Sequence, residues 1–148
     1  MRIGAIKPRL GCVRAVALTG AVLVIACVGT ALATGNSVHV QTPLTVPHGV
    51  QYSITLRGFA VNPERLYLFV DVHTCGANPS VEHHRANGFV WTVDGHFKEV
   101  SKGWFVRRGY VGLDHACGYL QSLSEPANSP FGVLARGFTT YAVGIRFG

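Results

Sequence analysis

Residues 50–72 read VQYSITLRGFAVNPERLYLFVDV, and the spacing of apolar side chains in this stretch decides the fold class. Between residues 50 and 59, and again between 66 and 72, apolar side chains recur at every second position. Side chains alternate between the two faces of a β-strand, so this period predicts two strands that each bury a face. No stretch after Ser37 has the i, i+3, i+4 spacing of an amphipathic helix. The sequence therefore predicts an all-β domain.

Similar short runs, bounded by Gly, Pro, Asn or Asp, predict the remaining strands. We expect these strands at residues 37–41, 89–93, 97–100, 104–113, 116–120 and 132–147. Asp94-Gly95 between two of them suits the tight turn of a hairpin, because both central positions of that turn need positive φ. About seven or eight strands predict a two-sheet antiparallel sandwich, and a small closed barrel is the alternative.

The first 33 residues differ from the rest of the chain in hydropathy and charge. Residues 15–33 read AVALTGAVLVIACVGTALA and contain no charged side chain. The basic residues before this run are Arg2, Lys7, Arg9 and Arg14. Such residues stay on the cytoplasmic side of a membrane. We predict a signal or anchor helix in residues 1–33 and a domain at 34–148 outside the cytoplasm, secreted or membrane-anchored.

Three fates of the apolar segment fit its sequence. The ALA tripeptide at residues 31–33 offers small residues that signal peptidase accepts, which predicts cleavage after Ala33. The run is also long enough to span a bilayer as an uncleaved anchor. VIAC at residues 24–27 resembles a bacterial lipobox, with Cys27 as the candidate lipidation site. Membrane contact is expected only through residues 15–33, and only if the segment is uncleaved or lipidated.

The formal charge of +6 lies mostly before the apolar run. Nine of the 13 basic residues and all seven acidic ones follow that run, so the domain carries +2. Arg107 and Arg108 form its only adjacent basic pair, which we interpret as a solvated strand edge. We therefore expect no nucleic-acid partner.

Cys75 and Cys117 are the only cysteines of the domain. In an oxidising compartment such a pair predicts a disulfide, which would stabilise the fold by about 4 kcal/mol. His73 and His115 each stand two residues before a cysteine. A zinc site of two thiolates and two imidazoles is therefore the alternative.

Two long connections, at residues 76–88 and 122–131, are the expected places for binding on this scaffold. A bridge between Cys75 and Cys117 would hold the base of the first loop. The candidate ligand-binding residues are Glu82, His83, His84 and Arg85 on the loop, with His73 and His115 beneath it. A solvated polar loop without a ligand is the alternative for each residue.

Motifs of the common enzyme classes are missing from the sequence. It contains no G-x-S-x-G, H-E-x-x-H, P-loop or dinucleotide-binding pattern. We expect no catalytic residue, no metal and no cofactor. The rival class is a secreted enzyme or metal-binding protein with a site near the two His-x-Cys-Gly segments, which would need Asp71, His73, Asp114 and His115 to converge in a pocket.

Residues 66–70 running toward Cys75, residues 116–120 around Cys117 and a last strand at 137–145 resemble secreted bacterial immunoglobulin-like β-sandwich domains. The sequence departs from antibody domains because Asp114 and His115 stand where a tyrosine corner would lie. The resemblance implies an Ig-like fold. Together with the export segment, it leads us to expect a non-enzymatic binding or structural module whose partner is an unknown protein or envelope ligand.

Overall fold

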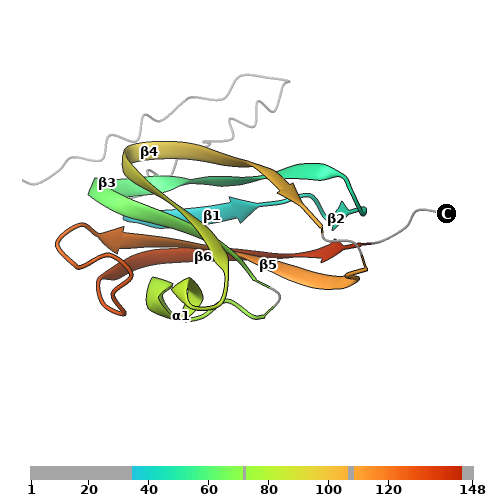
Figure 1. Ribbon diagram of the computed structural model, residues 1–148. Coiled ribbons are helices and arrows are strands. Elements are labelled where there is room, and N and C mark those ends of the chain that lie inside the picture. The colour runs from blue at the N-terminus through green and yellow to red at the C-terminus, as the bar shows by residue number, and fades with distance from the viewer. Residues whose placement is uncertain (1–34, 72, 107–108, 145–148) are drawn as a thin grey trace, which may run out of the picture. The chain divides into compact units, whose positions relative to one another are not determined.

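The computed structural model describes residues 35–71, 73–106 and 109–144. It confirms the all-β prediction (Figure 1). The elements are β1 (Ser37–Gln41), β2 (Thr45–Val46), β3 (Gln51–Asp71), α1 (Pro79–His83), β4 (Asn87–Phe105), β5 (Gly112–Ser122) and β6 (Val133–Val143). Within the described ranges no helix has the length and apolarity needed to cross a membrane. Three predictions fall outside these ranges: the export segment with Cys27, the Arg107-Arg108 strand edge and the strand end after residue 144.

The six strands belong to one sheet that curls into a half-barrel. Its order is β1-β3-β5-β6-β2, with β4 paired to β3. The first half of β3 pairs with β1, the second half pairs with β5, and β4 follows β3 along both halves. These pairs and β5–β6 are antiparallel, whereas β2 and β6 run parallel. Because β3 changes neighbours halfway along, the two halves of the sheet face each other across the core (Figure 1).

The bend that separates these halves lies at a β-bulge. Residues 61–63 of β3 stand opposite the single residue Asp94 of β4. Extra residues on one strand increase its local twist and bend it. Pro63 is tolerated here because proline has no backbone N–H to donate to the neighbouring strand, and the bulged residues are not paired. Gly95 has a φ of +60°. The predicted hairpin at Asp94-Gly95 is therefore wrong: the segments of β4 on either side of this dipeptide both pair with β3 and not with each other. A glycine with positive φ serves the bend at a bulge as well as a hairpin turn.

Two other boundaries differ from expectation. The strand predicted at residues 104–113 is interrupted, since β4 ends at Phe105 and β5 begins at Gly112. The loop at 76–88 contains α1, although no helix was expected there. Asn78 caps this helix, because its side-chain oxygen accepts a hydrogen bond of 3.3 Å from the backbone N–H of Val81.

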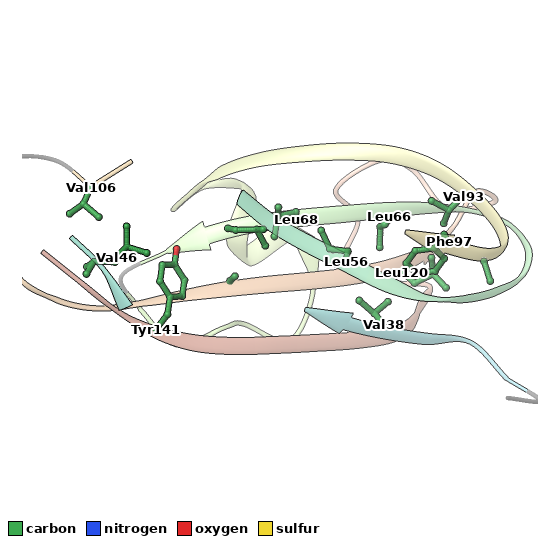
Figure 2. Packing of buried hydrophobic residues seen from close by; sticks show 14 residues of the cluster. Val38, Val46, Leu56, Leu66, Leu68, Val93, Phe97, Val106, Leu120 and Tyr141 are labelled. Carbon is green, nitrogen blue, oxygen red and sulfur yellow. The ribbon is translucent and has the colours of Figure 1, made fainter. Parts of the chain in front are cut away.

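The main core fills the space between the two halves of the sheet (Figure 2). Leu56 from the first half of β3 and Leu66 from the second are both fully buried. Val38 of β1 packs over Gly118 of β5, where a Cβ atom would come within 2.9 Å of the Val38 Cγ1 atom. The absence of a side chain at residue 118 therefore lets β1 approach β5 closely.

A second apolar cluster covers the opposite face of the sheet's β3–β5 part. Its buried members are Tyr67, Phe69, Cys117 and Tyr119, and Cys75 packs against it. Residues 66–69 are consequently buried on both faces, which explains why this part of β3 is a continuous apolar run. The loop that follows β3 lies over this second cluster and carries the candidate site.

Candidate functional site

A disulfide between Cys75 and Cys117 ties the start of the loop to β5, as predicted from the cysteine pair. The two Cα atoms are 5.6 Å apart and the residues are 42 positions apart in the chain. Because the two sulfurs are bonded to each other, they are not the free thiolates that the alternative zinc site requires. Within residues 35–71, 73–106 and 109–144, no three His, Cys, Asp or Glu side chains are grouped to hold a metal.

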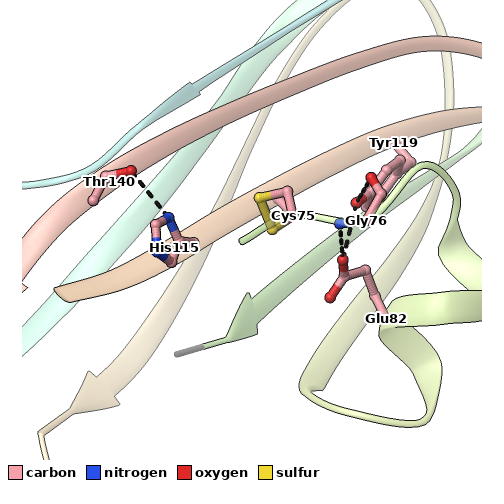
Figure 3. Close-up of a disulfide and its surroundings, with 7 residues drawn as sticks. Cys75, Gly76, Glu82, His115, Tyr119 and Thr140 are labelled. Atoms are coloured by element: carbon pink, nitrogen blue, oxygen red, sulfur yellow. Dashed lines mark hydrogen bonds between the residues drawn. A yellow bond between two sulfur atoms is a disulfide. The ribbon is translucent and has the colours of Figure 1, made fainter. Parts of the chain in front are cut away.

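Glu82 reinforces this tether from inside the loop (Figure 3). Its side chain is fully buried, and its Oε1 atom accepts a hydrogen bond from the Gly76 backbone N–H. The Tyr119 hydroxyl donates to the Gly76 carbonyl oxygen at 2.8 Å and to Glu82 Oε1 at 3.3 Å. The interpretation of Glu82 as a solvated or ligand-facing residue is therefore wrong. The short helix α1 turns this carboxylate inward, where it accepts the hydrogen bond of the Gly76 backbone N–H at the base of the loop.

The next three candidates remain together at the surface. His83, His84 and Arg85 are exposed, and all three line one open cleft of about 640 Å³, which we call the loop cleft. The rings of His83 and His84 meet edge to face, with their centroids 5.6 Å apart. The remaining lining residues are Tyr52, Val70, Ala86, Asn87, Trp104, Phe105, Val106, Tyr110 and Asp114.

Aromatic side chains also line the loop cleft. Phe105 is 61% exposed, and Trp104 meets Phe89 edge to face with ring centroids 5.4 Å apart. The Trp104 indole N–H donates to the Ser101 hydroxyl at 2.8 Å, which fixes the orientation of the ring. Exposed or half-buried rings of this kind offer stacking surfaces to a ligand.

Three phenols near the cleft stay neutral because of their surroundings. The Tyr52 and Tyr141 hydroxyls are 2.9 Å apart. Burial raises the pKa of Tyr52, and burial together with the Tyr52 hydrogen bond raises the pKa of Tyr141 well above its ordinary range. Partial burial and the Asp114 carboxylate raise the pKa of Tyr110. Tyr52 and Tyr110, which line the cleft, therefore offer hydrogen-bonding hydroxyls rather than anionic oxygens.

His115 and His73 lie away from the loop cleft. His115 Nδ1 is 3.0 Å from the Thr140 hydroxyl (Figure 3). The His115 ring lines a separate hollow of about 340 Å³ that Cys75 of the disulfide also lines. His73 is exposed and lines neither cavity. Asp114 lines the loop cleft, whereas its neighbour His115 lines the hollow, because adjacent residues of a strand face opposite ways.

The sequence did not indicate that Tyr52, Trp104 and Tyr110 belong to the site. The only signal was the adjacent pair Trp104-Phe105 after Gly103, which breaks the alternation of β4. In comparisons with known proteins, no protein-family model and no curated protein sequence matches this chain. Its function is therefore inferred from the geometry of the site.

Proposed function

We propose that residues 34–148 form an exported, non-enzymatic binding module that holds its ligand in the loop cleft. The observation that carries this proposal is that exposed His83, His84 and Arg85 line the same open cleft as the Trp104-Phe105 pair. Export is supported by the apolar run at residues 15–33 and by the disulfide, which belongs to oxidising compartments. The facing halves of the curled sheet support an Ig-like sandwich as the scaffold.

The chemistry of the cleft favours a ring-bearing anion as the ligand. A guanidinium such as that of Arg85 binds carboxylate or phosphate oxygens through paired hydrogen bonds. The histidines and the neutral tyrosine hydroxyls can hydrogen-bond to hydroxyl groups, while Trp104 and Phe105 stack against a ring face. An acidic sugar unit of an envelope or extracellular polymer has all of these features.

The tether at the base of the loop contributes to such binding. The disulfide and the Glu82 and Tyr119 hydrogen bonds hold the segment that carries His83, His84 and Arg85. A loop that is ordered before binding loses less entropy when the ligand arrives.

The cleft is tested by comparing two variants as baits for polysaccharide extracted from the cell envelope. The H84A/R85A variant alters only exposed cleft residues, whereas R136A alters an exposed arginine that lines the other hollow. We expect the cleft variant to bind acidic polysaccharide at least about tenfold more weakly and R136A to bind like the wild type. Equal binding by all three proteins, or loss in R136A alone, would place the site elsewhere.

Export is tested separately by the intact mass of the protein recovered outside the cytoplasm. A mature N-terminus at Thr34, a lipidated Cys27 or the complete chain would each support export and distinguish the three fates. Recovery of the complete chain only from the cytosol, with its cysteines reduced, would contradict it.

A further inference from the structure

A row of basic side chains crosses the outer face of the sheet's first half, at positions that do not line the loop cleft. The register pairs His39 of β1 with Arg57 of β3, and Arg57 with Lys98 of β4. All three residues are exposed. Directly opposite residues in antiparallel strands have Cβ atoms about 5 Å apart, so these three side chains stand in line.

In the part of the chain that the structure describes, no carboxylate stands beside the row to balance it. The neighbouring rows contain Ser37, Phe59 and His96 on one side, and Gln41, Thr55 and Val100 on the other. Glu99 pairs with core residue Leu56 and therefore projects from the opposite face. Asp94 lies four residues before Lys98, about 13 Å along the strand. Among the described residues, no acidic side chain occupies these three rows.

Like charges placed directly opposite each other destabilise a sheet, so the row of Arg57 and Lys98 does not serve stability. Lys102 is also exposed and extends the positive charge further along β4. Features that weaken a fold locally are expected where the surface has a binding role. The charge of this face requires a partner with closely spaced negative groups.

We propose that this basic face, formed by His39, Arg57, Lys98 and Lys102, docks onto an anionic phospholipid surface. The length of chain before β1 favours that occupant. Three residues separate Ala33, the end of the apolar run, from Ser37, the start of β1. Four steps of extended chain reach at most about 14 Å. A domain whose apolar run stays in the bilayer therefore keeps β1 within reach of the lipid headgroups.

Each basic residue near an anionic membrane strengthens attachment by about fivefold. The row across three strands presents its basic side chains next to one another, as binding to several closely spaced phosphates requires. This contact extends beyond residues 15–33 and is independent of the ligand in the loop cleft, because the two surfaces share no residue.

The test uses the full chain inserted in lipid nanodiscs and the acylation rate of its lysines. The only lysines are Lys7, Lys98 and Lys102, so modification of the last two reports directly on the basic face. We expect acylation of both to be at least about fivefold slower in discs containing phosphatidylglycerol than in discs of phosphatidylcholine alone. About 1 M salt should abolish the difference, because it screens charges beyond about 3 Å.

Matched variants separate this contact from a general effect of anionic lipid. R57E keeps both lysines and should lose the protection, with R57Q as a milder form if R57E does not fold. R136E lies on β6, outside the face, and should be protected like the wild type, as should the cleft variant H84A/R85A. Equal acylation in the two kinds of disc would overturn the proposal. Protection by soluble inorganic polyphosphate but not by anionic lipid would also overturn it, in favour of a polymer.

Discussion

The hydroxyl of Tyr119 on β5 donates a hydrogen bond of 2.8 Å to the carbonyl oxygen of Gly76 at the start of the loop. Gly76 follows Cys75, and Tyr119 lies two residues after Cys117, so this hydrogen bond and the disulfide join the same two segments. The loop is thereby fixed both covalently and through a buried polar contact. His84 and Arg85 are therefore exposed on a loop whose base is held in place.

Removing the polar part of this tether should destabilise the domain. We expect E82A to lower the free energy of unfolding by about 2–3 kcal/mol, because it leaves the Gly76 N–H without its acceptor. Y119F should cost about 1–2 kcal/mol. The exposed neighbour His83 provides the control, and H83A should stay within about 0.5 kcal/mol of the wild type. Urea denaturation followed by circular dichroism measures the free energy of unfolding of all three variants. An E82A variant as stable as the wild type would contradict the buried position of Glu82.

Removing the disulfide should have a larger effect than either hydrogen-bond variant. C75S/C117S should lower the free energy of unfolding by about 4 kcal/mol, since the bridge joins residues 42 positions apart. Wild-type protein treated with a reductant should show a similar loss, whereas the double variant should be insensitive to reductant. Thermal denaturation with and without reductant measures both effects. Equal melting temperatures of the oxidised and reduced wild type would show that the bridge does not restrain the loop.

The bulge at the bend of the sheet depends on Gly95. Its φ is +60° and the space around a Cβ atom is open, so alanine there meets backbone strain without a clash. We expect G95A to cost about 1–2 kcal/mol. Gly35 also has open space but no positive φ, and G35A should be neutral. A neutral G95A, measured by the same denaturation method, would argue against this bend.

Alkaline pH should weaken the domain through its tyrosine pair. Tyr141 and Tyr52 both have a pKa raised above the ordinary value of 10.0. The unfolded chain therefore loses these phenolic protons first, and the stability they contribute is complete below about pH 10 and is lost as the pH rises further. Y141F should be less stable than the wild type near neutral pH but should lose less stability between about pH 9 and 11. Identical slopes of melting temperature against pH would contradict this explanation.

The sequence predicted the strand-rich fold and the disulfide for separate physical reasons. Alternation in residues 50–59 reveals a strand with one buried face. Two cysteines in a domain that is expected to be exported have few other partners. The sequence could not show that Asp94-Gly95 lies opposite a bulge of β3, because a hairpin turn and this bend use the same backbone conformation at glycine. The number of residues opposite the dipeptide decides between them, and that depends on the pairing of β3 with β4.

The candidate site was predictable only in part. His83, His84 and Arg85 were identified as a polar group on a long loop, and the structure places them together in the loop cleft. Glu82 is next to them in sequence but faces inward, because consecutive residues of a helix such as α1 point about 100° apart around its axis. Trp104 is distant in sequence and reaches the cleft only because β4 bends back across the sheet.

The central claim, that the loop cleft holds the ligand, is tested most directly by hydrogen exchange of the wild-type protein with and without the captured acidic polysaccharide. Binding in the cleft predicts slower exchange of the backbone amides at residues 83–87 and 104–106, while residues 136–140 beside the other hollow remain unchanged. Slower exchange confined to residues 74–76 and 136–140, or no change anywhere in the domain, would contradict the claim.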